Sequence, residues 1–122
     1  MQATLFEATP NNIAVKNYSH DLQSLIYGNG GHMPATIKFW EDGGHGWLQV
    51  PHNLLKKLKI QGSISSYSYR DDVFAYLEED CDLSIFMRAI NIDSGSDEQR
   101  KFWNTCPKEY HEESPIRRKK QY

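Results

Sequence analysis

Apolar and polar residues alternate most regularly on either side of the Gly43-Gly44 pair. A two-residue Gly-Gly segment between alternating runs predicts a tight β-hairpin. Folding the chain about this pair places Trp40 opposite Trp47. One face of the hairpin is then entirely apolar and consists of Ile37, Phe39, Leu48 and Val50. A shift of one residue would mix the two faces, so the pattern fixes the register.

The opposite face of this hairpin is mixed in character. It carries Lys38, Trp40, Trp47 and Gln49. If helices cover the apolar face, these four side chains are exposed, and Trp beside Lys and Gln is typical of an interaction surface. We therefore predict that they form the functional surface. The alternative is that the N-terminal segment or the C-terminal tail covers the two Trp residues.

A second alternating run predicts another hairpin between Ser63 and Glu79. Placing Asp71-Asp72 in the turn pairs Tyr69 with Phe74. One face is then aromatic and consists of Tyr67, Tyr69, Phe74 and Tyr76. The serines on the other face are interpreted as small spacers that allow a helix to approach closely.

Each predicted hairpin is followed by apolar residues at helical spacing. The first set follows Pro51 and consists of Leu54, Leu55 and Leu58; the second consists of Leu83, Phe86, Met87 and Ile90. Asp80 or Asp82 can cap the second helix. These elements predict an α+β fold in which an antiparallel sheet of two hairpins, each followed by a helix in the order ββαββα, has its helices on one face.

The chain has 122 residues, which is enough for one domain. We divide it into an N-terminal extension at 1–32, partly ordered with a short helix at 21–27, and a core domain at 33–92. Residues 93–122 lose the apolar periodicity and end in a basic run, 117–120. We expect this tail to be flexible, apart from an anchor at Phe102 and Trp103, and to contribute little to stability.

The chain carries a formal net charge of −2, so it has no overall electrostatic footprint for nucleic acid. The sequence contains neither a signal-peptide pattern nor an apolar run long enough to span a bilayer, and we predict a cytoplasmic protein. Its two cysteines, Cys81 and Cys106, are interpreted as free structural thiols.

Acidic residues are densest around the end of the second hairpin, where they comprise Glu78, Glu79, Asp80 and Asp82. Carboxylates suit Mg²⁺ or Ca²⁺, but neighbours on a strand point to opposite faces, and acidic residues are favourable at a helix N-terminus in any case. His45 and His52 with Cys81 could in principle hold zinc, although their spacing does not require it. We expect no structural zinc and no cofactor.

Three segments have a familiar appearance: GHGWLQVP at 44–51, ISSYSY at 64–69 and YLEEDCD at 76–82. Together they resemble an uncharacterised family of small proteins and domains from proteobacterial genomes, plasmids and phages. That family has no assigned activity, so no functional residue can be transferred. The resemblance implies an accessory protein of a phage or mobile element.

Three functions remain open. The first is a non-enzymatic, protein-binding accessory factor of a phage or mobile element that acts on a host or defence-system protein, for example an anti-CRISPR-like inhibitor. The second is a nucleic-acid-binding module that uses aromatic stacking, the basic tail and Lys56, Lys57 and Lys59. The third is a metal-dependent hydrolase built on His45, Glu78, Glu79 and Asp80. Three convergent ligands would favour the third, and a basic patch continuous with the two Trp residues would favour the second.

Overall fold

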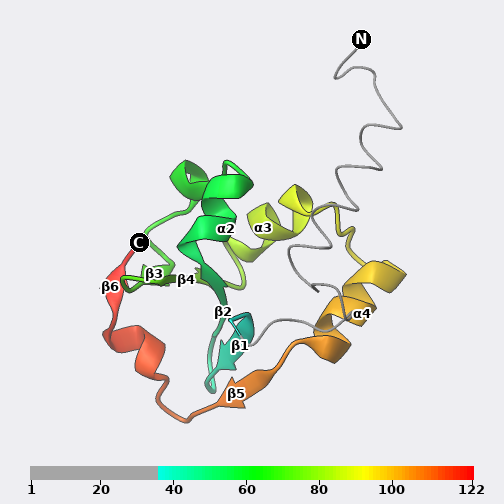
Figure 1. The fold of residues 1–122 in the computed structure, drawn as a ribbon. Coiled ribbons are helices and arrows are strands. Elements are labelled where there is room, and N and C mark those ends of the chain that lie inside the picture. Colours follow the sequence, from blue (N-terminus) through cyan, green and yellow to red (C-terminus); the bar gives the residue numbers. More distant parts are fainter. Residues whose placement is uncertain (1–35) are drawn as a thin grey trace. The chain divides into compact units, whose positions relative to one another are not determined.

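The computed structural model describes residues 36–122, so the predicted extension at 1–32 and its helix lie outside the described residues. The described part is an α+β fold whose six-stranded sheet has the order β5-β1-β2-β4-β3-β6 (Figure 1). The strands are β1 (Lys38–Glu41), β2 (Gly46–Pro51), β3 (Tyr69–Arg70), β4 (Phe74–Glu78), β5 (Lys108–Tyr110) and β6 (Lys120–Gln121). The helices are α2 (His52–Lys57), α3 (Leu83–Ala89) and α4 (Asp97–Thr105), with two 3-10 turns, η1 (Gln61–Ser63) and η2 (Pro115–Arg118).

The first hairpin has the predicted register, because β1 and β2 pair with Trp40 opposite Trp47. The turn depends on Asp42 rather than on its two glycines. The Asp42 carboxylate Oδ1 accepts hydrogen bonds from the backbone N–H groups of Gly44 and His45, at 2.9 and 2.8 Å. Neither Gly43 nor Gly44 has a positive φ, so the Asx-type turn needs no left-handed residue.

The second hairpin is shifted by two residues from the predicted register. Tyr69 lies opposite Tyr76, so its predicted pairing with Phe74 is wrong. The cause is Asp71, whose Oδ1 accepts from the N–H groups of Val73 and Phe74 and so becomes the first residue of the turn. Because the shift is even, the faces of the strands are unchanged.

The apolar face of the first hairpin and both helical stripes form a core, as their spacing predicts. The buried residues include Ile37, Phe39, Leu48, Val50, Leu54, Leu55, Leu58, Leu83, Phe86, Met87 and Ile90. Trp103 of α4 meets Phe39 edge to face, with ring centroids 5.1 Å apart. The three α-helices lie on one side of the sheet and η2 on the other (Figure 1). None of the helices described is long and apolar enough to cross a membrane.

Asp82 precedes α3 but does not cap it with its side chain. Its buried Oδ2 instead accepts hydrogen bonds from the Ser65 backbone N–H and from the hydroxyls of Ser65 and Ser68. The Ser68 hydroxyl in turn accepts from the backbone N–H of Glu78. These serines are therefore donors to a buried carboxylate, and not merely small spacers.

Residues 93–122 are part of the fold, which corrects the prediction of a flexible tail. They form α4, β5, η2 and β6, and bury Phe102, Cys106 and Ile116. β5 pairs with β1 in parallel, so the sheet is mixed and the prediction of an antiparallel sheet is wrong. The strands β5 and β6 are three and two residues long, too short for alternation to reveal them.

The C-terminal segment also covers the predicted Trp surface. Ile116 of η2 packs with Trp47 and Tyr76, and Trp47 is only 2% exposed. Trp40 is half-buried, stacks on His111 and donates from Nε1 to Gln49, which is itself buried. Lys38, the charged residue among the four, is half-buried, and its Nζ pairs with Glu109 at 3.0 Å. The prediction that this face meets water is wrong for Trp47 and Gln49, which are buried, whereas Lys38 and Trp40 are half-buried.

Candidate functional site

The three segments at 44–51, 64–69 and 76–82 converge on one pocket of about 300 Å³, called here the hairpin pocket. It is lined by His45, Trp47, Tyr67, Tyr69, Glu78, Asp80, Cys81 and Arg117. Only Arg117 comes from outside the three segments. Tyr67 is 69% exposed and offers an open aromatic ring beside two carboxylates.

The pairing of β2 with β4 brings His45 and Glu78 together. Trp47 lies opposite Glu78, and the Glu79 N–H donates to the Gly46 carbonyl at 3.0 Å. His45, in the turn just before β2, therefore lies beside the end of β4. Its Nδ1 is 3.2 Å from Glu78 Oε2. Two residues that are far apart in the sequence thus become neighbours through strand register alone.

Backbone groups hold the Glu78 carboxylate in place. Its Oε1 accepts hydrogen bonds from the N–H groups of Asp80 and Cys81, at 2.8 and 3.0 Å. The other oxygen, Oε2, is left to face His45. Glu78 is 7% exposed, so the carboxylate is fixed in a largely dry setting.

The remaining predicted site residues lie elsewhere. Glu79 is exposed and approaches Gly46. Partial desolvation and the neighbouring carboxylates of Asp80 and Glu78 raise its pKa, and His45 acts against them. Asp82 is engaged with the serines, and His52 Nε2 lies 2.8 Å from the Asp71 carbonyl oxygen. From the acidic cluster, Glu78 and Asp80 are the residues whose carboxylate oxygens converge with a ring nitrogen of His45.

Neither thiol has the environment of a nucleophile. Desolvation and the adjacent Glu78 raise the pKa of Cys81. Burial raises the pKa of Cys106 to about 11. Both cysteines are free, and both favour the protonated form at neutral pH.

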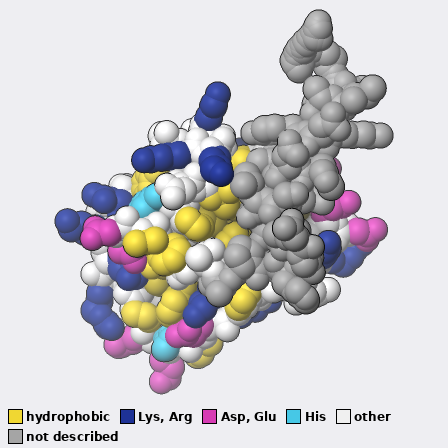
Figure 2. All heavy atoms as spheres, in the orientation of Figure 1, with side chains coloured by type: hydrophobic (Ala, Val, Ile, Leu, Met, Phe, Trp, Pro, Cys, Tyr) yellow, Lys and Arg dark blue, Asp and Glu magenta, His cyan; other side chains and the backbone are white. Residues whose placement is uncertain are grey.

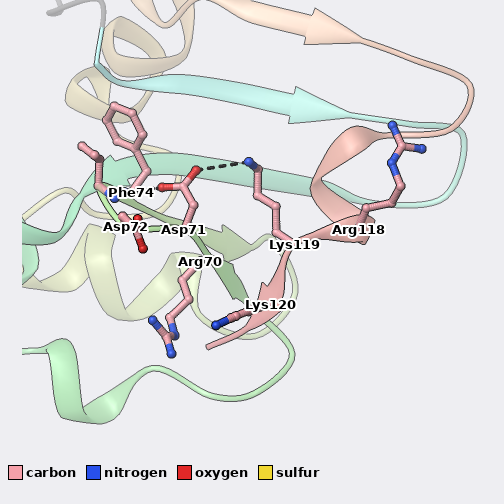
Figure 3. Close-up of a pocket in the computed structure, with 8 residues that line it drawn as sticks. Arg70, Asp71, Asp72, Phe74, Arg118, Lys119 and Lys120 are labelled. Carbon is pink, nitrogen blue, oxygen red and sulfur yellow. Dashed lines mark hydrogen bonds and ion pairs between the residues drawn. The ribbon is translucent and has the colours of Figure 1, made fainter.

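A second hollow of about 540 Å³ lies at the β3–β6 edge of the sheet (Figure 3). It is lined by Arg70, Asp71, Asp72, Val73, Phe74, Arg118, Lys119 and Lys120. Lys119 is already engaged there, since it pairs with Asp71 at 3.1 Å and lies over the Tyr76 ring. Lys and Arg side chains gather on the side of the molecule where α2 and β6 lie (Figure 2).

Arg70 and Lys120 lie directly opposite each other on β3 and β6. Their side chains are neighbours in Figure 3, whereas Arg118 points away from them. We call Arg70, Lys120 and the exposed Val73 the basic edge. Sequence reasoning noted the basic run that contains Lys120 but missed Arg70, because the pairing of β6 with β3 has no signal in the sequence.

A scan against protein-family models, a search of curated proteins and a search of solved structures each found no match. The class of protein is therefore defined by the structure itself: an α+β domain with a mixed six-stranded sheet. The resemblance to small phage- and plasmid-borne proteins stays a prediction.

Proposed function

We propose that this chain is a protein-binding module that holds an acidic segment of a partner protein on its basic edge. The observation behind the proposal is the cross-strand pair of Arg70 and Lys120. Both side chains are exposed, and neither has an ion-pair partner among residues 36–122. Like charges directly opposite on paired strands destabilise a sheet by roughly 0.2–1 kcal/mol. A carboxylate placed between the two cations would remove that repulsion.

The surroundings of the pair favour a protein over a nucleic acid. Val73, at the tip of the second hairpin, is 59% exposed and aliphatic, and gives no ring for a base to stack on. Phe74 is half-buried and meets Tyr76 edge to face. Asp72 is exposed in the same hollow and repels phosphates. An exposed apolar residue beside arginine is a common arrangement in protein interfaces.

The proposed partner is a host or defence-system protein. The support for it is the resemblance of residues 44–51, 64–69 and 76–82 to small proteins of phages and mobile elements. Under this proposal the chain acts as an accessory factor by occupying a surface of that partner, as an anti-CRISPR-like inhibitor would.

The test uses a charge-reversal variant and a matched control. A fluorescent oligoglutamate peptide serves as the first probe, and a partner captured from a proteobacterial lysate and then purified serves as the second. Arg70→Glu with Lys120→Glu should weaken binding of both by about tenfold or more, since one charge-assisted contact contributes about 1.5–3 kcal/mol. The control, Lys56→Glu with Lys57→Glu, makes the same charge change on the exposed side of α2 and should leave binding unchanged.

Two results would contradict the proposal. One is equal weakening by the control variant, which would indicate a response to net charge alone. The other is submicromolar binding of DNA or RNA at physiological salt, with an affinity that falls steeply as salt rises. That result would favour the nucleic-acid-binding function.

A further inference from the structure

An imidazole nitrogen and two carboxylate oxygens, from His45, Glu78 and Asp80, all lie within 4.8 Å of one another. They come from the first hairpin turn, the end of β4 and the turn after β4. We infer that these three residues form a binding site for one divalent transition-metal ion in the hairpin pocket. This inference is independent of the proposed protein contact, which lies on the basic edge.

The Glu78 carboxylate is preorganised as a ligand. Its Oε1 is held by two backbone N–H groups, from Asp80 and Cys81, which fixes the plane of the carboxylate. Its Oε2 faces His45 Nδ1 at 3.2 Å. Hydrogen bonds that orient a ligand in this way are what distinguish a metal site from a chance group of acidic side chains.

The other two ligands can close on an ion without moving the backbone. An ion about 2.1 Å from each ligand atom brings those atoms within about 4 Å of one another. The His45 side chain is 47% exposed and Asp80 is exposed, so rotation about their side-chain bonds closes the remaining gap. Only Glu78 is fixed, and it already points inward.

Trp47, beside the three ligands, carries an unsatisfied donor. Trp47 Nε1 is the one fully buried side-chain N or O atom without a hydrogen-bond partner in the part of the chain described. An unsatisfied buried donor costs about 1–3 kcal/mol. Trp47 forms part of the pocket wall.

The ligand set selects the class of ion. A nitrogen ligand with two carboxylates suits Zn²⁺ or Mn²⁺ better than Ca²⁺ or Mg²⁺, which prefer oxygen ligands throughout. The thiol of Cys81 lines the pocket but does not belong to the group of convergent ligand atoms. The site is therefore a nitrogen–oxygen site. The sequence predicted no zinc because His45 and Glu78 are separated by 33 positions, and only the β2–β4 register joins them.

The test is titration of the full chain, without an affinity tag, with Zn²⁺ by calorimetry. We expect one ion per chain and a rise in the thermal midpoint. His45→Asn, Glu78→Gln and Asp80→Asn should each weaken Zn²⁺ binding about tenfold or more. Glu79→Gln is the matched control, because Glu79 follows β4 and its carboxylate does not belong to the group of convergent ligand atoms. This variant should leave the affinity unchanged. Mg²⁺ should bind at least about tenfold more weakly than Zn²⁺.

Co²⁺ bound to the wild-type chain provides a second readout, the ligand type, that needs no substitution of the three ligands. A nitrogen–oxygen site gives weak visible bands without a thiolate charge-transfer band, and Cys81→Ser leaves them unchanged. The inference is overturned if wild-type chain binds no Zn²⁺, if Glu79→Gln weakens binding as much as Glu78→Gln does, or if Cys81→Ser abolishes binding.

Discussion

The two hairpin turns are built alike, although only the first was predicted in the correct register. Each begins with an aspartate whose Oδ1 accepts from the N–H groups two and three residues later. Asp42 starts the first turn and Asp71 the second. The glycines that made the first turn visible in the sequence have ordinary φ values. The aspartate is therefore the shared cause of both turns.

The C-terminal segment ties both turns down in the same way. Arg117 pairs with Asp42 at 2.7 Å and lies over the ring of Trp47. Lys119 pairs with Asp71 and lies over the ring of Tyr76. In each case the ring belongs to the residue five positions after the aspartate. The turns differ in exposure, because the Asp42 side chain is 4% exposed and that of Asp71 is 34% exposed.

Removal of the C-terminal segment, which contacts both turns, should have the largest effect on stability. A chain that ends at Ile92 loses Phe102 and Ile116 from the interior and both cations from the turns. We expect no cooperative thermal unfolding of this shortened chain.

The substitution Ile116→Ala alone should lower the free energy of unfolding by about 2–5 kcal/mol, because it leaves a cavity beneath η2. Calorimetry measures both, with exposed Val73→Ala as the near-neutral control. A normal midpoint for the shortened chain would restore the view of residues 93–122 as a flexible tail.

The loss of unfolding free energy on replacing each turn aspartate should be larger for the less exposed one. Asp42→Ala should cost about 2–3 kcal/mol and Asp71→Ala about 1–2 kcal/mol, since both lose charged hydrogen bonds but water replaces those of Asp71 more readily. Asp72→Ala is the control: this aspartate is exposed, and should change stability by less than about 0.5 kcal/mol. Urea denaturation gives all three values. If Asp72→Ala destabilised the protein as much as Asp71→Ala, the result would favour the register first predicted, with Asp71-Asp72 as the two turn residues.

The sequence predicted what depends on local spacing. Leu54 and Leu55 in α2, the stripe of α3 and the register of the first hairpin follow from residues close together in the chain. The second register could not be obtained from alternation, because a shift of two keeps the same faces and only the Asp71 side chain decides between them.

Contacts between distant segments were not predictable. Trp47 was assigned to the surface because nothing in the sequence indicates that Ile116, in a polar region, packs onto it. For the same reason, the approach of His45 to Glu78 has no signal in the sequence. Residue spacing does not distinguish an exposed Trp face from one that the tail covers.

A smaller effect on stability should appear at acid pH, where protonation of Asp71 weakens the second turn. Burial opposes ionisation of Asp71, but hydrogen bonds from Tyr76, Phe74 and Val73, with Lys119, outweigh it and hold the pKa of Asp71 well below its usual range. The stability from this lowered pKa is present above pH ~4 and is lost as the pH falls toward the folded-state pKa. Between about pH 4 and pH 2, the unfolding free energy of wild type should therefore fall more steeply than that of Asp71→Asn. Parallel curves for the two proteins would show that Asp71 has no altered titration.

The smallest effect should come from the glycines of the first turn. If Asp42 makes the turn, Gly43→Ala and Gly44→Ala should leave stability unchanged or raise it by about 0.4–1 kcal/mol, because an alanine there restricts the unfolded chain. A Cβ at either position would meet no atom closer than 3.9 Å. Gly46→Ala is the contrasting variant, because a Cβ there would clash with Phe39 Cζ and force that buried ring to move. Thermal unfolding of the three variants distinguishes a glycine required by backbone conformation from one required by close packing. Marked destabilisation by Gly43→Ala or Gly44→Ala would mean that the first turn depends on its glycines after all, and that the likeness between the two turns is only geometric.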